Sequence, residues 1–319
     1  MATAIGLFAL GILMLWAGSE FVTRNIGPLA RSLGVKELVI TALGISVLSS
    51  LPELTLSLFA LAKGDAAISL GNIIGSNFVT LTFVTAICAL VRPINIHEEV
   101  QARESSWMIL SSSFVLLLAM DGRLSRSEGV LLILLYLPYV LSVLKTAREE
   151  AQNSPDGPRE ISKLWTSSGT VLGIFCIIAG SKIALDSGAV LGRTLGISSV
   201  IMGVLLFAFG TSLPELTISL SATFKKKSDV TIGEVYASNI FTQLVVLGLC
   251  CLFRPIEVAP ALISFAMPFL IVASVVIQLF VTSGRRLNRI EALGLLGFYF
   301  LFAASQFWPL PSLESVLGF

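Results

Sequence analysis

The chain has 319 residues, of which 55% are hydrophobic and only 13% charged, and its mean hydropathy is +0.90. Soluble domains carry about 25% charged residues, so this composition predicts a membrane protein embedded in a lipid bilayer. The formal net charge of +1 argues against a nucleic acid or another polyanion as partner.

Apolar runs long enough to cross a bilayer, about 20 residues each, predict ten membrane-spanning helices. In chain order they cover residues 4–22, 38–61, 68–91, 105–120, 127–145, 166–185, 198–222, 231–253, 259–282 and 290–307. The first run has no basic segment before it and no clear cleavage site, so we expect a retained span rather than a signal peptide. The longest hydrophilic link, residues 146–165, is too short for a folded soluble domain.

The distribution of basic residues predicts the orientation of these spans. Of the 21 Lys and Arg residues, 15 lie in the loops that follow the odd-numbered spans. Basic loops stay in the cytoplasm, so these loops, including the linker 146–165, are expected to be cytoplasmic. Both termini are then expected outside the cytoplasm, and the chain in a cell membrane.

An internal repeat relates the two halves of the chain at a constant offset of 162 residues. The offset aligns AGSE (17–20) with AGSK (179–182), LGV (33–35) with LGI (195–197), SLPELT (50–55) with SLPELT (212–217), Gly71 with Gly233, SN (76–77) with SN (238–239) and Arg92-Pro93 with Arg254-Pro255. Five spans separate equivalent points, so the second half is expected to cross the membrane upside down. We therefore predict an all-α polytopic fold with inverted five-helix repeats at 1–145 and 166–319, a pattern typical of secondary transporters.

Each SLPELT motif places a proline and a glutamate at the level of the membrane interior. Pro52 and Pro214 lack an N–H for the helix ladder, so carbonyl oxygens are freed and the helices are expected to break there. Glu53 and Glu215 follow directly, and each carboxylate would cost about 2.5–3.5 kcal/mol at a helix centre if left uncompensated. Nearby hydroxyls come from Ser49, Ser50, Thr211 and Ser212. This oxygen-only cluster predicts a site for hard cations such as Na⁺ and Ca²⁺.

Helical spacing predicts the walls that face these motifs. Polar residues recur at i, i+4 and i+8 as Asn72, Ser76 and Thr80, and again as Glu234, Ser238 and Thr242. Small residues in membrane helices also serve close packing, and GNIIG (71–75) is a GxxxG pattern, so packing stays an alternative for this stripe.

Glu234 has two readings at this stage. Thr231 and Glu234 form a T-x-x-E pattern, which is typical of a capping box at a helix start. The alternative is an accessory cation ligand in an access path.

The motifs SSLPELTLS with GNIIGSN and GTSLPELTIS with GEVYASN resemble the two alpha-repeats of the sodium/calcium exchanger family, in the calcium/cation antiporter superfamily. The resemblance covers nearly the whole chain. It implies ten helices, four cation sites clustered at mid-membrane, and alternating access by sliding of the first and sixth helices against a fixed core. It also implies exchange of Ca²⁺ for Na⁺ by a monomer without a cofactor.

The resemblance also implies roles for particular residues. Glu53 and Glu215 would be the central carboxylates shared by calcium and sodium sites. Hydroxyls of the flanking sodium sites would come from Ser50, Ser76, Ser212 and Ser238. Backbone oxygens near Ser46, Ser49, Ala208 and Thr211 would complete the shells, and Thr80 and Thr242 would occupy the remaining central positions.

Several positions depart from the family pattern. Asn and Asp are usual where Thr80 and Thr242 stand, GT is usual at 48–49, and Asn and Gly are usual at 234 and 237. Two glutamates give a formal site charge of −2, which one Ca²⁺, two Na⁺ or two H⁺ would balance. We therefore expect fewer than three monovalent ions per calcium. Exchange of Ca²⁺, or of another divalent cation, for H⁺ by the same glutamate pair stays an alternative.

Functions from other classes fit the sequence less well. The only histidine, His97, lies in a predicted cytoplasmic loop, there is no buried aspartate dyad, and HExxH is absent, so an intramembrane enzyme is not expected. A passive channel would not need two carboxylates that are occupied in turn, and a membrane scaffold would need no acids at this depth.

Overall fold

The structure is a computed structural model of the chain, and it describes residues 1–32, 44–95, 98–151, 163–226, 228–284 and 286–307. His97, the start of the second predicted span and residues 152–162 of the predicted linker lie outside these ranges. The helices on either side continue into the linker, because α8 ends at Ala151 and α9 begins at Lys163.

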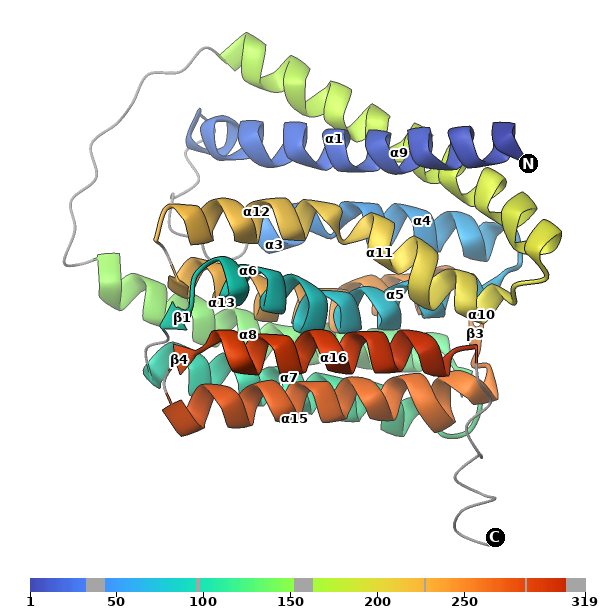
Figure 1. The fold of residues 1–319 in the computed structure, drawn as a ribbon. Helices are drawn as coiled ribbons and strands as arrows, with labels where there is room; N and C mark the ends of the chain where they lie inside the picture. The colour runs from blue at the N-terminus through green and yellow to red at the C-terminus, as the bar shows by residue number, and fades with distance from the viewer. Residues whose placement is uncertain (33–43, 96–97, 152–162, 227, 285, 308–319) are drawn as a thin grey trace, which may run out of the picture.

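Helices make up almost all of the described chain (Figure 1). The elements of the first half are α1 (Ala2–Ser32), α3 (Ile45–Ser49), α4 (Leu51–Ala62), α5 (Ala66–Val79), η2 (Thr80–Val84), α6 (Thr85–Val91), β1 (Ile94–Asn95), α7 (Glu98–Ala119), β2 (Arg123–Leu124) and α8 (Arg126–Ala151). Those of the second half are α9 (Lys163–Leu195), α10 (Ser199–Ile201), η3 (Met202–Phe207), α11 (Ala208–Thr211), α12 (Leu213–Phe224), α13 (Ser228–Phe241), η4 (Thr242–Val246), α14 (Leu247–Phe253), β3 (Ile256–Glu257), η5 (Leu262–Ala266), α15 (Met267–Gly284), β4 (Arg286–Leu287) and α16 (Arg289–Ser305).

Seven helices of the described chain are long and apolar enough to cross a membrane, and an eighth span results if the bent pair Ser199–Thr211 and Leu213–Phe224 is counted as one. The apolar part of α7, Glu104–Ala119, is shorter, and α16 has 17 residues. A multi-pass helical membrane fold is thus confirmed, whereas the count of ten spans stays a prediction.

Both SLPELT motifs lie at breaks between helices. Ser50 separates α3 from α4 and Ser212 separates α11 from α12, with nearly identical backbone angles at the two serines (φ −86°, ψ 7° and φ −82°, ψ 3°). Pro52 and Pro214 fall in the first turn of the following helix, where a missing N–H costs no hydrogen bond. Figure 1 shows α4 and α12 running in opposite directions, as an inverted repeat requires.

The described part of the chain contains the π-helical segments η2, η3, η4 and η5, of which η2 and η4 are equivalent at the 162-residue offset. These two segments begin at the last residues of the predicted polar stripes, Thr80 and Thr242. The sequence analysis did not predict these segments.

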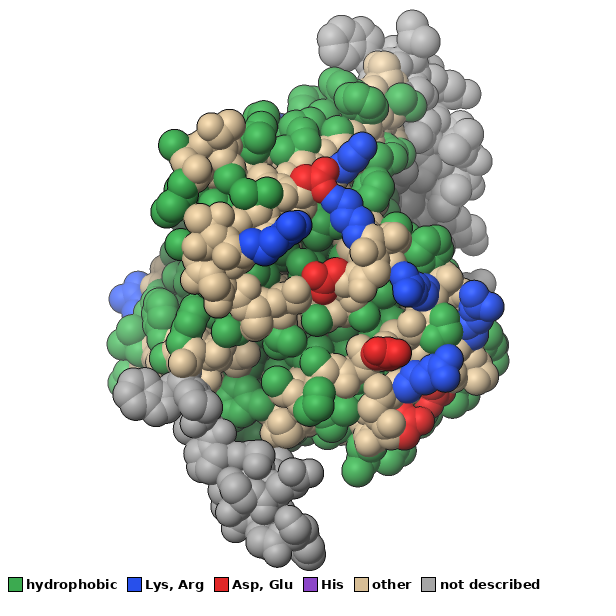
Figure 2. Space-filling model, turned by 90° about the vertical axis from the view of Figure 1, so that its right-hand side faces the viewer, with side chains coloured by type: hydrophobic (Ala, Val, Ile, Leu, Met, Phe, Trp, Pro, Cys, Tyr) green, Lys and Arg blue, Asp and Glu red, His purple; other side chains and the backbone are tan. Residues whose placement is uncertain are grey.

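Two short antiparallel strand pairs connect the halves at opposite ends of the bundle (Figure 1). One pair joins β1 of the first half to β4 of the second, and the other joins β2 to β3. The links that follow the even-numbered predicted spans gather at the β2–β3 end, where the structure has them at residues 63–65, 120–125, 196–198 and 254–259. Charged side chains lie on this end of the molecule among hydrophobic ones (Figure 2).

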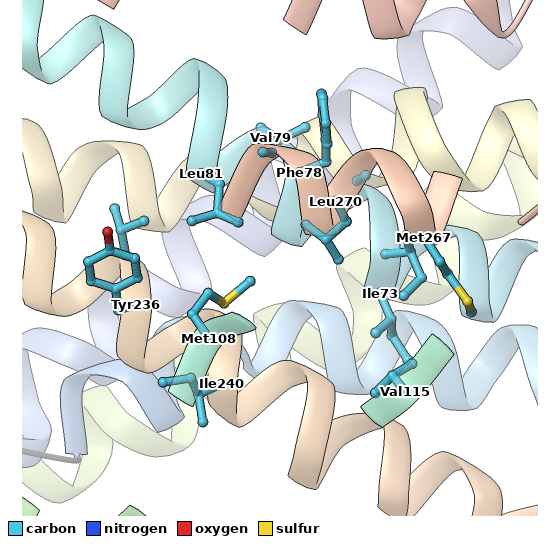
Figure 3. Close-up of a cluster of buried hydrophobic side chains, with 14 of the residues drawn as sticks. Ile73, Phe78, Val79, Leu81, Met108, Val115, Tyr236, Ile240, Met267 and Leu270 are labelled. Atoms are coloured by element: carbon cyan, nitrogen blue, oxygen red, sulfur yellow. The ribbon is translucent and has the colours of Figure 1, made fainter. Parts of the chain in front are cut away.

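The hydrophobic core lies where α5, α7, α13 and α15 meet. In Figure 3 the side chains of Ile73 and Phe78 from α5, Met108 from α7, Ile240 from α13 and Leu270 from α15 gather in one cluster, and each is fully buried. Helices α1, α8, α9 and α16 instead expose many large apolar side chains, which is the surface expected of helices in contact with lipid.

Glycines let α5 approach the second half closely. A Cβ on Gly71 would lie 3.2 Å from the backbone of Gly203 and Val204, and one on Gly75 would collide with the carbonyl oxygen of Val204. GNIIG therefore serves the close helix packing that the sequence analysis kept as an alternative.

Candidate functional site

The two glutamates of the SLPELT motifs lie inside the bundle. Glu53 and Glu215 occupy the first turns of α4 and α12, and each is only 2% exposed. The N-terminus of a helix carries a partial positive charge, which favours a carboxylate in its first turn. The break at each motif thus places an acid where the backbone itself favours negative charge.

These carboxylates interact with each other and with the opposite half of the chain. Glu215 lies close enough to Glu53 for an electrostatic interaction. The hydroxyl of Thr211 lies within hydrogen-bonding reach of Glu53, and the equivalent hydroxyl, that of Ser49, reaches Glu215. Each half therefore contributes a hydroxyl beside the acid of the other half.

Several buried oxygens at this place have no hydrogen-bond partner. They are one carboxylate oxygen (Oε2) of Glu53, Oε2 of Glu215 and the hydroxyl of Ser212. A buried polar atom without a partner costs about 1–3 kcal/mol, and more when it is charged. Among the described residues no Lys or Arg is buried, so no side-chain cation neutralises these acids.

The polar stripes on α5 and α13 face this region. Thr242 donates to the hydroxyl of Ser50 (3.3 Å), and Thr80 lies 3.0 Å from the side-chain oxygen of Asn239. Ser76 and Ser238 bond to carbonyls of their own helices. The structure brings the two stripes together with the broken helices from both halves.

Two of the four carbonyls predicted to complete the ion shells, those of Ser46 and Ala208, accept hydrogen bonds within their own broken helices. The carbonyl of Ser46 accepts from the hydroxyls of Ser49 (3.2 Å) and Ser50 (2.9 Å). The carbonyl of Ala208 accepts from the hydroxyl of Thr211 (3.4 Å) and the N–H of Ser212 (3.1 Å). The assignment of all twelve predicted residues as ion ligands stays a proposal.

The structure also places side-chain amides in this region, of which the sequence analysis predicted only Asn72, as part of the polar stripe. Asn72 accepts from the hydroxyl of Thr211 at 3.1 Å, and Asn239 donates to Thr80 at 2.8 Å. Asn77 accepts from the side chain of Gln243 at 3.2 Å. The dipeptide SN recurs at 76–77 and 238–239, and this repetition could have indicated Asn77 and Asn239.

Glu234 does not cap a helix. Helix α13 begins at Ser228, so Thr231 and Glu234 lie in its interior and the capping-box interpretation is wrong. Glu234 is 7% exposed and accepts from the hydroxyls of Ser49 (2.9 Å) and Ser46 (3.0 Å). It therefore belongs to the same polar region as Glu215.

The side chains of this region offer oxygen atoms as ligands. Within the described residues no group of three or more His, Cys, Asp and Glu side chains converges on one point suited to a metal ion. Carboxylates, hydroxyls and amide oxygens inside an apolar bundle can bind hard cations, and two opposed broken helices supply them from both halves. The fold and the site define a membrane protein of the cation-transporter class.

Comparisons with known proteins identify the family. A sequence model described as "Sodium/calcium exchanger protein" matches residues 3–145 and 166–308, so the chain belongs to the sodium/calcium exchanger family. This is a family of transporters rather than enzymes, and cation antiport is its class of activity.

Individual relatives agree along nearly their whole length. The inner membrane protein YrbG of Escherichia coli is 30% identical, with 88% of this chain and 89% of that protein covered. The sodium/calcium exchanger MaX1 of Methanosarcina acetivorans is 27% identical, with 94% and 97% covered. A solved structure of the sodium-calcium exchanger NCX_Mj, soaked with Na⁺ and Sr²⁺, matches with a TM-score of 0.70 at 27% identity, covering 95% of this chain and 98% of that one.

Proposed function

We propose that this protein exchanges Ca²⁺ for Na⁺ across a cell membrane by alternating access, with Glu53 and Glu215 as the central ligands shared by the two ions. The protein works as a monomer, as two inverted repeats at 1–145 and 166–319. The loops after the odd-numbered spans face the cytoplasm, and both termini face the other side.

One observation carries this proposal. Two acids from opposite halves are buried within electrostatic reach of each other, and each has a carboxylate oxygen without a partner. Two adjacent buried charges repel each other unless positive charge lies between them. Because no basic side chain is buried in the described part of the chain, a cation from solution supplies that charge.

Exchange follows from the same geometry. One Ca²⁺ or two Na⁺ would neutralise the pair equally, so the two kinds of ion compete for one set of oxygens. Because the glutamate pair is stable only with cations bound, the protein changes the side of the membrane to which the site opens only when the site is occupied. The inward flux of one ion is thereby coupled to the outward flux of the other.

The test is ⁴⁵Ca²⁺ uptake into proteoliposomes that contain the purified protein. We expect uptake driven by an outward Na⁺ gradient and none driven by a pH gradient alone. Glu53→Gln and Glu215→Gln each remove one charge while keeping the side-chain shape, and we expect uptake to fall at least 100-fold, to the level of empty vesicles.

A matched control is Glu104→Gln on α7. Glu104 is also a buried acid, and it accepts from the hydroxyl of Tyr139 on α8 at 2.7 Å. We expect Na⁺-driven uptake by this variant to stay within about threefold of the unsubstituted protein. Uptake by Glu53→Gln or Glu215→Gln that matches the control would refute the site, and uptake driven only by a pH gradient would replace Na⁺ by H⁺ as the counter-ion.

A further inference from the structure

A hollow of about 500 Å³ opens on the surface at the β1–β4 end of the bundle (Figure 1). It lies beside the β1–β4 strand pair, where α16 begins. Its walls come from both halves of the chain and are Pro93, Arg286, Asn288, Arg289 and Ile290. Two guanidinium groups thus line one hollow together with an apolar side chain.

The described part of the chain does not compensate the charge of these two arginines. Within it, neither Arg286 nor Arg289 forms an ion pair with a carboxylate. Glu291 is the acid closest to them in sequence, and its Oε2 oxygen accepts from the backbone N–H of Asn288 at 2.8 Å. The hollow therefore carries positive charge and suits an anion.

The fold holds one of the two guanidinium groups in place. The Nε–H group of Arg289 donates to the carbonyl of Leu90, in the last turn of α6, at 3.1 Å. A guanidinium has five N–H groups, so this bond leaves four for a ligand. Because the side chain is already oriented, it loses less rotamer freedom when it binds an anion.

The start of α16 adds no further donors to the hollow. The side-chain oxygen of Asn288 accepts from the N–H groups of Ile290 (2.8 Å) and Glu291 (3.0 Å). This capping box uses the amides that would otherwise attract an anion to a helix start. An anion in the hollow is therefore bound by the arginine side chains, which pair with phosphate oxygens through parallel hydrogen bonds.

Apolar surface that faces lipid begins directly beside these arginines. Ile290, which lines the hollow, is 81% exposed, and Leu293 on the next turn of α16 is 58% exposed. Residues 290–307 form the tenth predicted span, so both side chains lie at the start of a membrane segment. A ligand that contacts both parts has a charged group next to a hydrocarbon chain, as a phospholipid has.

The predicted orientation places the hollow at the cytoplasmic surface. Strand β1 and the link between α15 and α16 both follow odd-numbered predicted spans, whose loops are expected in the cytoplasm. Anionic lipids give the cytoplasmic leaflet a negative surface potential, which attracts basic side chains close to the membrane.

The opposite corner of the bundle lacks this combination of side chains. At the 162-residue offset, Arg286, Arg289 and Ile290 correspond to Leu124, Ser127 and Glu128. Glu128 accepts from the N–H of Ser125 at 2.6 Å and from its hydroxyl at 2.7 Å, so an acid occupies the β2–β3 corner. Because the repeat builds the same corner there without these arginines, the fold does not require them at β4 and α16.

We propose that this hollow binds the headgroup of an anionic phospholipid, such as phosphatidylglycerol or cardiolipin, from the adjoining leaflet. The two arginines bind phosphate oxygens, and Ile290 and Leu293 pack against the start of an acyl chain. A zwitterionic headgroup fits less well, because its ammonium group would lie beside two guanidinium groups. The inference goes beyond the proposed function and does not depend on which ions are exchanged.

The experiment counts bound lipid by native mass spectrometry of the purified full chain in a non-ionic detergent. Phosphatidylglycerol or phosphatidylcholine is titrated without Ca²⁺ and at fixed ionic strength. We expect the first phosphatidylglycerol to bind more tightly than the first phosphatidylcholine. The double variant Arg286→Gln with Arg289→Gln should weaken phosphatidylglycerol binding about 30-fold, since each arginine beside an anionic lipid contributes about fivefold. Equal affinity for the two lipids overturns the inference.

A matched control removes the same charge at the other end of the bundle. Arg123→Gln with Arg126→Gln changes two exposed arginines at the β2–β3 corner, and this variant should bind phosphatidylglycerol as the unsubstituted protein does. Detergent micelles have no leaflets, so attraction by net charge alone would affect both double variants equally. Equal weakening in the two double variants overturns the inference.

A single variant keeps the test valid if loss of the bond between Arg289 and Leu90 disturbs the fold. Arg286→Gln leaves that bond in place and should weaken phosphatidylglycerol binding about fivefold. Unchanged binding by this variant overturns the inference.

A competition experiment distinguishes a lipid from a soluble phosphate ester. Glycerol phosphate carries the same phosphate without acyl chains, and at the concentration of the lipid it should not displace phosphatidylglycerol. Displacement would assign the hollow to a soluble phosphate ester and overturn the inference.

Discussion

The side chains of Thr80 and Asn239 form a hydrogen bond between the two halves of the bundle. The amide of Asn239 donates to the hydroxyl of Thr80 at 2.8 Å and to the carbonyl of Val235 at 2.5 Å. Both residues are buried, so neither hydrogen bond competes with water. The equivalent pair, Asn77 and Thr242, bonds to Gln243 and Ser50 instead.

A double-mutant cycle tests this connection. Thr80→Ala and Asn239→Ala should each lower the free energy of unfolding by about 1–3 kcal/mol, because each leaves a buried polar partner unsatisfied. The two effects should fall short of additivity by about 0.5–1.5 kcal/mol. The measurement is denaturant unfolding in detergent micelles. Strict additivity would show that the two side chains do not stabilise each other.

For individual residues, the sequence predicted the burial of the two SLPELT glutamates but not the role of the neighbouring Glu234. Glu53 and Glu215 were predicted to be buried because proline and glutamate recur together in apolar segments, and they are. The role of Glu234 could not be resolved, because T-x-x-E indicates a cap only if the helix starts there. Helix α13 starts at Ser228, three residues before Thr231.

Among the elements, the contact between α5 and η3 fixes the position of the polar stripe. Gly71 and Gly75 meet the backbone of Gly203 and Val204 with no room for a side chain between them. The stripe residue Ser76 follows directly on Gly75, so any separation of α5 from η3 moves the ligands. Packing and ion binding thus depend on the same helix face.

Substitution of Gly75 tests this dependence. Gly75→Leu should separate α5 from η3 and destabilise the fold, with a large loss of monodisperse protein in size-exclusion chromatography. A matched control is Gly297→Ala on α16, where an added Cβ meets nothing within 4 Å. That change should be neutral or stabilise by about 0.5–1 kcal/mol, since Gly is a poor helix former. Equal yields of the two variants would contradict the packing argument.

The sequence predicted where helices run and where two of them break, because apolar length and proline are local signals. It did not predict the π-helical segments η2 and η4. Their residues have the same apolar pattern as the α-helices around them, so the pattern carries no signal for the wider turn. In the structure the hydroxyl of Thr85, the first residue of α6, donates to the carbonyl of Thr80, the first residue of η2, at 2.9 Å.

In the whole molecule, α1 and α9 lie together on one side of the bundle (Figure 1). They approach closely at glycines, since a Cβ on Gly18 would lie 2.7 Å from the carbonyl of Gly173. In the described part of the chain, few polar contacts hold this pair to the broken helices. Trp16 donates to Thr217 at 2.8 Å, Ser19 donates to the carbonyl of Leu48 at 3.5 Å, and the hydroxyls of Thr55 and Ser181 lie 2.6 Å apart. An ion pair between Lys63 and Asp186 adds to these contacts.

This arrangement fits the sliding motion that the proposed function requires. A tightly packed pair with few bonds to its neighbours can move as a unit, because the motion breaks only a few hydrogen bonds of about 0.5–1.5 kcal/mol each. The repeat predicted two equivalent helices, but only the structure shows that they pack on each other.

A reversible cross-link between α9 and α4 tests the motion. Thr55→Cys and Ser181→Cys would place two thiols where the hydroxyls now touch, in a background from which Cys88, Cys176, Cys250 and Cys251 are removed. Oxidation should fix α9 to α4 and lower Na⁺-driven ⁴⁵Ca²⁺ uptake at least tenfold, and a reductant should restore it.

The control is a cross-link within the moving unit. Asn25→Cys and Gly169→Cys would join α1 to α9, where a Cβ on Gly169 would lie 3.0 Å from the side-chain Cγ of Asn25, the position that the sulfur of a cysteine would take. If α1 and α9 move together, this bond spans no sliding surface, so oxidation should leave uptake within about threefold. Full uptake by the oxidised Thr55 and Ser181 pair would show that α9 does not slide along α4, because a covalent bond there permits no sliding.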